Sequence, residues 1–112
     1  MIRNGGRYRI VLVTCASIAE ARKIGRSAVE KKVAACANIV PGVESIYRWK
    51  GSVERAREVL VVMKTTSNRL SQLEREVKRV HSYDVPEFIV LRVVAGSADY
   101  LAWIRASTAP MT

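Results

Sequence analysis

Two β-rich runs joined across Gly51 constrain the fold of this chain more than any other feature. Residues 43–50 alternate between two faces and place Tyr47 and Trp49 on the same face, whereas residues 58–65 are almost continuously apolar, as in a buried strand. A turn at Gly51 makes one long antiparallel hairpin of them. A hairpin of this length overreaches a small sheet and exposes aromatic surface and an unpaired strand edge. The pattern therefore predicts a homo-oligomer.

Helix and strand patterns alternate along the rest of the chain. Ser17 stands three residues before Glu20, the spacing of a capping box in which each side chain satisfies a free backbone N–H. Pro41-Gly42 breaks the segment that leads into the hairpin. The other predicted elements are a strand over 8–14, a helix from 17 to about 33, a helix capped by Ser67 and ending near 81, a strand over 88–94 and a helix over 98–106.

This element order predicts an α+β fold. Strand, helix, strand, strand, helix, strand and a final helix suit a ferredoxin-like sandwich, βαββαβ plus a C-terminal helix, with helices on one face of an antiparallel sheet. The 112 residues fit a single domain over 1–112, with a core over about 8–106. Apolar stretches are too short to span a bilayer, and two cysteines are too few for a disulfide scaffold. We expect a cytoplasmic protein with two free thiols and no membrane partner.

A net charge of +9 raises the question of nucleic-acid binding. The distribution of the charge argues against it, because the basic residues of the two predicted helices are interspersed with glutamates, as on solvated helix faces. No recognisable RNA- or DNA-binding motif accompanies them. Nucleic acid is therefore not an expected partner.

The only histidine opens the run 81–87, between a helix pattern and a strand pattern. His81 is a natural transition-metal ligand, and a thiolate such as that of Cys36 would favour soft Cu(I). Each residue also has a structural interpretation. A histidine at a helix end can bond the terminal carbonyls, and Cys36 beside two alanines can be a small buried apolar residue.

Four segments together carry a family resemblance. Residues 32–42, residues 45–51, Glu58-Val59 with Met63-Lys64-Thr65, and residues 81–87 resemble the CutA family of divalent-cation tolerance proteins in order and spacing, and the match covers about residues 10–104. The resemblance implies a ferredoxin-like subunit in a tight homotrimer, related in shape to the PII signalling proteins. It also implies a role in the response to copper and other divalent metals.

The resemblance bears on the metal ligands as well. In some members of the family, a cysteine on the first strand and two adjacent histidines have been proposed as copper ligands. Here Val13 stands in the place of that cysteine and Val80 in the place of the first histidine, so only His81 carries over. Cys15 shares a strand face with Val13 and is a possible substitute one pleat repeat away. We expect His81 and Cys36 to bind copper or another divalent transition metal that the fold itself does not need.

The alternative function is a PII-like regulatory module. Its inter-subunit clefts would bind a small anion or a partner protein, and the expected lining residues besides His81 are Tyr47, Trp49, Lys64, Tyr83 and Glu87. The two hairpin aromatics also suit packing anchors of a trimer, and Lys64 could instead pair with Glu58 or Glu87. No nucleophile sits in an activating motif and no Gly-rich phosphate loop follows a strand, so an enzyme is not expected.

Overall fold

The computed structural model describes residues 1–110 and contains a four-stranded antiparallel sheet. Its strands are β2 (Tyr8–Cys15), β3 (Cys36–Trp49), β4 (Ser52–Thr66) and β5 (Ile89–Arg92), in the order β3-β4-β2-β5. This order is consistent with a split βαβ arrangement. The predicted α+β class, with an antiparallel sheet and helices, is confirmed.

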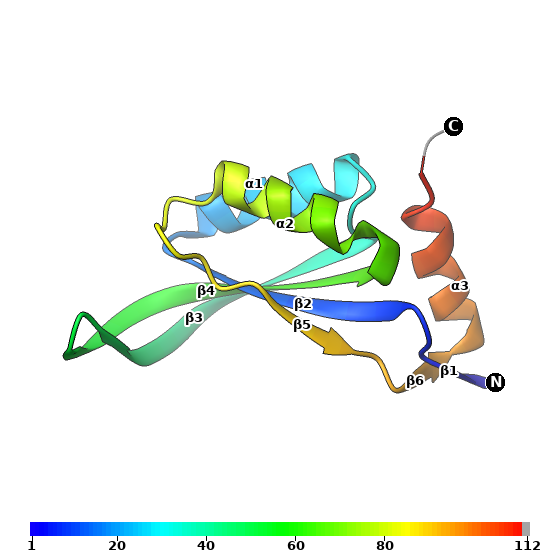
Figure 1. Ribbon diagram of the computed structural model, residues 1–112, viewed down its shortest axis with the longest axis horizontal. Helices are drawn as coiled ribbons and strands as arrows, with labels where there is room; N and C mark the ends of the chain where they lie inside the picture. The colour runs from blue at the N-terminus through cyan, green and yellow to red at the C-terminus, as the bar shows by residue number, and fades with distance from the viewer. Residues whose placement is uncertain (111–112) are drawn as a thin grey trace.

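Two helices cover one face of this sheet. Figure 1 shows α1 (Ile18–Glu30) and α2 (Leu70–Val80) side by side above the strands, and α3 (Ala98–Ser107) apart from them at one end. The main core lies between the sheet and the first two helices, where Ile24, Met63 and Leu73 are its largest fully buried side chains. Gly25 lets α1 approach β3 closely, since an added Cβ would lie 2.9 Å from Ala37 Cβ.

The β3–β4 hairpin is longer than the sequence indicated. The expected break at Pro41-Gly42 is wrong as an end of the strand, because the register shift between Val40 and Val43 lets β3 continue through it. At the tip, Lys50 and Gly51 both have positive φ, 49° and 84°, and join Trp49 to Ser52 in a two-residue turn. Figure 1 shows the hairpin projecting well beyond the helices.

The helix ends also differ from the prediction. Ser17 caps α1 by accepting a hydrogen bond from Glu20 N at 3.1 Å, but the Glu20 carboxylate bonds Ser82 N instead of completing the capping box. The helix stops at Glu30, short of residue 33, and Lys32 turns the chain with φ of 60°. The Ser67 cap is wrong, because residues Ser67–Arg69 form a separate 3₁₀ turn.

A second, two-stranded sheet was missed by the sequence reasoning. Strand β1 (Ile2–Asn4) pairs with β6 (Ala95–Ser97), and Met1 O accepts a hydrogen bond from Ala98 N at the start of α3. Each strand has three residues, which is too few to show a period of two. Among residues 1–110, no helix is long and apolar enough to cross a membrane.

Candidate functional site

His81 ends α2 and turns its ring toward the sheet. Its side chain is fully buried, Nε2 lies 2.7 Å from the carbonyl oxygen of Thr14, and Nδ1 lies 3.1 Å from the backbone N–H of Tyr83. A carbonyl can only accept and an N–H can only donate, so Nε2 carries the proton and Nδ1 is the acceptor. The expected contact with terminal carbonyls of its own helix is replaced by this bond across to β2.

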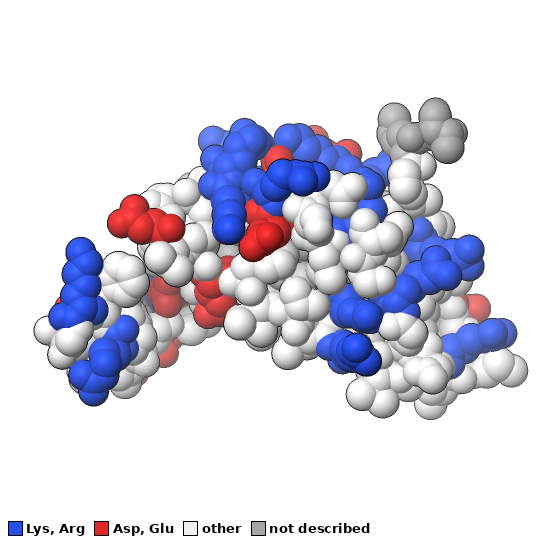
Figure 2. Space-filling view, viewed as in Figure 1, with Lys and Arg blue, Asp and Glu red and all other residues white. Residues whose placement is uncertain are grey.

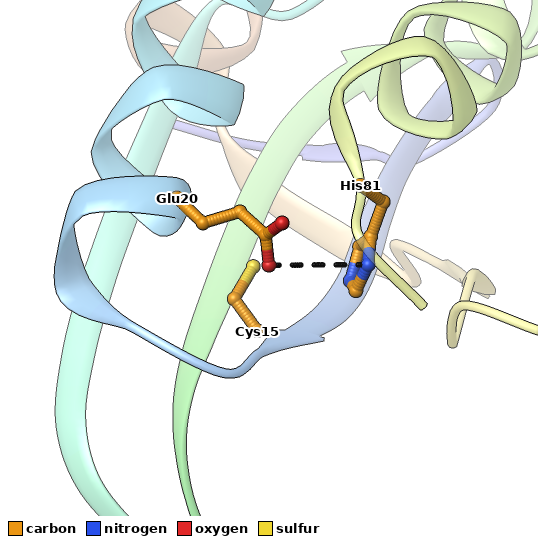
Figure 3. A group of neighbouring side chains, drawn as sticks. All are labelled: Cys15, Glu20 and His81. Carbon is orange, nitrogen blue, oxygen red and sulfur yellow. Dashed lines mark ion pairs between the residues drawn. The ribbon is translucent and has the colours of Figure 1, made fainter. Parts of the chain in front are cut away.

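Two further side chains meet His81 at this point. Cys15 ends β2, Glu20 lies in the first turn of α1, and the potential ligand atoms of all three residues lie within 4.8 Å of one another. Figure 3 shows the Glu20 carboxylate directed toward the sulfur and the ring. Within residues 1–110 this is the one group of three or more His, Cys, Asp or Glu side chains gathered so closely. We call it the Cys15–Glu20–His81 cluster.

Glu20 carries the unusual feature of the cluster. Its Oε1 accepts from Ser82 N at 2.8 Å, but its buried Oε2 has no hydrogen-bond partner and lies 4.0 Å from His81 Nδ1. Burial, reinforced by the nearby charges of Glu20 and Glu58, raises the pKa of the Cys15 thiol to about 12. Cys15 is therefore a protonated thiol at neutral pH, beside a carboxylate oxygen that lacks a donor.

Cys36, the other expected metal ligand, does not meet His81 within the subunit. It pairs in register with Lys64, which pairs with Ile10, whereas His81 contacts Thr14 four residues further along β2, roughly 13 Å away. Cys36 also lies on the face of the sheet opposite the helices, with Lys64, while His81 lies on the helix face. These two residues therefore cannot share one ion inside a single subunit.

Lys64 belongs to the surroundings of Cys36. Its Nζ donates to Asn38 Oδ1 at 2.6 Å, and no ion pair joins it to Glu58 or Glu87 in the part of the chain that the structure describes. Cys36 Sγ lies 3.9 Å from both Asn38 Oδ1 and the Tyr100 hydroxyl. Burial, followed by the contact with Cys36, raises the pKa of Tyr100. Lys64 is thus anchored away from the remaining expected cleft residues.

Four of the residues expected in a cleft between subunits line one cavity within the single subunit. A cleft of about 800 Å³ opens between the half of the hairpin that leads to its tip and the segment after α2. Tyr47, Trp49, Tyr83 and Glu87 line it, and Lys64 and His81 do not. The other lining residues are Thr14, Glu44, Ser45, Ile46, Glu58, Ser82, Asp84 and Val85. We call this cavity the acidic cleft, because four of these residues are carboxylic acids and none is Lys or Arg.

Glu58 is the most enclosed carboxylate of the acidic cleft. The residue is only 7% exposed, and its Oε2 accepts from the Tyr83 hydroxyl at 2.7 Å. Burial and this hydrogen bond raise the pKa of Tyr83 well above its usual value. Burial and the charge of Glu58 raise the pKa of Glu87, against a smaller opposing effect of Thr14. The cleft therefore concentrates negative charge in a partly desolvated space.

The sequence did not indicate Glu20 as a site residue, and it favoured Cys36 over Cys15 as a metal ligand. The capping-box spacing gave Glu20 a sufficient local explanation, so nothing pointed to its contact with residues 62 positions away. Glu44 and Asp84 were also missed as cleft residues, because a lone acidic residue in a strand or loop carries no signal of its own. For Glu58 the sequence suggests no role in the cleft beyond a possible ion pair with Lys64, which the structure does not form.

Comparisons with known proteins are consistent with this structure. Residues 9–107 match the family model described as CutA1 divalent ion tolerance protein. The divalent-cation tolerance protein CutA of Thermus thermophilus is 44% identical over 99 residues, which cover 88% of this chain and 96% of that one. The human protein CutA is 43% identical over 92% of this chain, which spans only 58% of that longer protein.

Solved structures of relatives share the fold. CutA from Synechococcus elongatus PCC7942, solved in complex with Bis-Tris, superposes with a TM-score of 0.88 at 34% identity, covering 96% of this chain and 99% of that one. The Thermus thermophilus protein gives a TM-score of 0.89 at 43% identity, with 91% and 99% of the two chains covered.

Proposed function

This chain belongs to the CutA1 divalent ion tolerance family, and we propose that it responds to copper or another divalent transition metal by binding the ion at the Cys15–Glu20–His81 cluster. The single observation that carries the proposal is the buried Glu20 Oε2, which has no hydrogen-bond partner and faces His81 Nδ1 at 4.0 Å. A buried polar atom without a partner costs free energy, and a bound cation removes that cost. Imidazole nitrogen, thiolate and carboxylate together suit copper or zinc.

Binding requires two local changes. His81 Nδ1 must give up the hydrogen bond from Tyr83 N, and Cys15 must lose its proton if its sulfur is to act as a ligand. Since the thiol pKa is about 12 without the metal, metal binding through Cys15 releases a proton. The affinity for the metal should therefore rise with pH across the neutral range.

The test uses the two cysteines as a matched pair. Cu(I) affinity is measured by competition with a chromophoric chelator for the wild type, Cys15→Ser and Cys36→Ser. We expect Cys15→Ser to weaken binding by at least about tenfold, because it removes a ligand, and Cys36→Ser to leave it unchanged. Equal affinity in all three proteins, or a loss confined to Cys36→Ser, would remove the cluster from the metal site.

We further propose a homotrimeric assembly, with a ferredoxin-like subunit. The exposed apolar residues of the edge strand β5, Ile89, Val90 and Leu91, support an assembly because an isolated edge of this kind invites pairing. The projecting hairpin, 14 and 15 residues in its two strands, supports it for the same reason. Sedimentation equilibrium tests this proposal, and a monomer at micromolar concentration would contradict it.

A second candidate function rests on the acidic cleft. Its volume of about 800 Å³ is that of a small-molecule site, which favours a PII-like regulatory module, and one relative was solved with Bis-Tris bound. An anionic ligand fits poorly, because the lining has four carboxylic acids and no Lys or Arg.

The proposed compartment is the cytoplasm and the proposed role is non-enzymatic. Cell fractionation and a ligand screen by thermal shift test these points.

A further inference from the structure

The acidic cleft has a charge opposite to that of the chain that forms it. The sequence contains 19 Lys and Arg residues against 10 Asp and Glu. The cleft nevertheless takes four of these acids, Glu44, Glu58, Asp84 and Glu87, and no basic residue lines it. Glu44 pairs with Arg55 at 3.6 Å in an exposed ion pair, which leaves Glu58, Asp84 and Glu87 without a cation among residues 1–110. In Figure 2 red side chains lie where the hairpin arm meets the body, while blue ones lie over the helices, on the far end and at the tip of the hairpin. The cleft is therefore a local negative site on a positive molecule, and cations will concentrate there.

Glu58 makes this site more than a group of surface acids. It is more than nine-tenths buried and lines the cleft, yet its one hydrogen-bond donor is the neutral Tyr83 hydroxyl. No ion pair reaches it within residues 1–110. Buried carboxylates in proteins are almost always paired with a cation. Glu58 thus lacks a positive partner that the open cleft has room to supply.

The walls of the cleft show what kind of cation fits. Tyr47, Trp49 and Tyr83 contribute aromatic rings, whose faces attract ammonium groups and pack against alkyl chains. The Trp49 ring already has the Lys50 ammonium over it, 5.9 Å from its centroid, at the exposed tip of the hairpin. Aromatic rings offer little to a small hydrated metal ion, whose preferred ligands are oxygen, nitrogen and sulfur atoms.

The spacing of the carboxylates also disfavours a single metal ion. Within residues 1–110, the one set of three such ligand atoms within 4.8 Å is the Cys15–Glu20–His81 cluster, so the acids of the cleft are spread around its wall. A metal ion would reach two of them at most. An extended molecule with several positive groups would reach more of them at once.

We propose that the acidic cleft binds a small linear polyamine, with one ammonium group at Glu58 and another between the aromatic rings and the outer carboxylates. A volume of about 800 Å³ is sufficient for such a molecule. The lining of the acidic cleft includes none of Cys15, Glu20 and His81, so loss of spermidine binding and loss of metal binding are measured on different side chains. The ligand of the cleft is a cation, in place of the anion expected for a PII-like cleft.

Spermidine is the probe, titrated calorimetrically at fixed ionic strength into the full-length protein. The test variant is Glu58→Gln, which removes the charge and keeps an acceptor for Tyr83. The control is Glu30→Gln, which removes the same charge from the exposed surface of α1. We expect Glu58→Gln to weaken spermidine binding by about tenfold to a hundredfold, the effect of losing a charged hydrogen-bond acceptor, and the control to bind like the wild type.

Tryptophan fluorescence gives an independent readout. Trp49 lines the cleft, whereas Trp103 lies on α3 outside it, so a spermidine-induced change should disappear in Trp49→Phe and persist in Trp103→Phe. Three results overturn the proposal: equal binding by Glu58→Gln and wild type, the same response to magnesium chloride at matched ionic strength, or binding of a lysine-rich peptide without binding of spermidine. The last would place a partner protein in the cleft.

Discussion

Two glutamates of equal burial have opposite surroundings in this molecule. Glu76 on α2 is 8% exposed and Glu58 on β4 is 7% exposed. Glu76 accepts from Lys31 Nζ at 2.9 Å, from Arg79 Nη2 at 2.6 Å and from the Ser27 hydroxyl, whereas Glu58 accepts from Tyr83 alone among the described residues. Burying a charge is costly unless the charge is compensated. Glu76 is therefore a structural link between α1 and α2, and Glu58 is the feature of a binding site.

The largest expected effect concerns the structural glutamate. Glu76→Gln should lower the free energy of unfolding by about 2–3 kcal/mol, because it weakens four hydrogen bonds from three residues to a charged group and leaves two cations without their partner. Glu74→Gln, on the same helix but in an exposed pair with Lys78, should change it by less than about 0.5 kcal/mol. Urea unfolding at one protomer concentration measures both. Equal losses of stability in Glu76→Gln and Glu74→Gln would contradict a structural role for Glu76.

The dependence of stability on acidic pH should also show the structural role of Glu76. The hydrogen bond from Arg79, with help from Ser27 and Lys31, holds the pKa of Glu76 well below its usual range. A lowered pKa means that the stabilisation is fully present above the ordinary glutamate pKa of about 4.3 and is lost as the pH falls through the folded-state value. Unfolding measured from pH 6 to pH 2 should show the wild type losing more stability than Glu76→Gln. Parallel curves for the two proteins would contradict this assignment.

In the absence of ligand, Glu58→Gln should change the free energy of unfolding in the opposite direction from Glu76→Gln. Removing a buried charge that has no cationic partner should raise the free energy of unfolding by about 0.5–1 kcal/mol, since the amide oxygen still accepts from Tyr83. The same urea titration measures it. A loss as large as that of Glu76→Gln would show that Glu58 has an unrecognised partner, such as a basic residue of a neighbouring subunit.

The smallest effect belongs to Glu87. Its pKa is raised by burial and by the charge of Glu58, so the folded state resists its ionisation. The sign is then the reverse of that for Glu76: the stability present below the ordinary glutamate pKa is lost as the pH rises through the raised value. Between pH 4 and pH 6, the free energy of unfolding should fall less in Glu87→Gln than in the wild type. It should also fall less in Glu58→Gln, because the charge that raises the pKa of Glu87 is gone. A decline unchanged in both variants would place its origin outside the acidic cleft.

The sequence predicted the fold better than it predicted the site. Hydrophobic periodicity located both long helices and the four main strands, because each buries one regular face against the core. The grouping of Tyr47, Trp49, Tyr83 and Glu87 came from the family resemblance and not from periodicity, and these four residues line one cleft of the subunit. Periodicity did not separate Cys36 from His81, since strand register and face depend on the β-bulge and on tertiary packing.

The polar side chains were the least predictable part. Glu20 fits a capping box by spacing, and only the packing of α1 against the end of α2 directs its carboxylate to Ser82 and His81. Glu58 sits in an ordinary strand pattern, and its lack of a cation becomes visible only when its neighbours are known. Such roles depend on contacts between residues distant in sequence, which periodicity does not report.

The central claim is that a buried carboxylate without a cation marks a ligand site, whereas a compensated one marks a structural link. It is tested most directly by the spermidine-induced gain in unfolding free energy for the wild type, Glu58→Gln and Glu76→Gln, at fixed ionic strength and protomer concentration. We predict that Glu58→Gln loses most of the gain and that Glu76→Gln, although less stable, keeps it. An equal gain in all three proteins, or a gain lost only in Glu76→Gln, would contradict the claim.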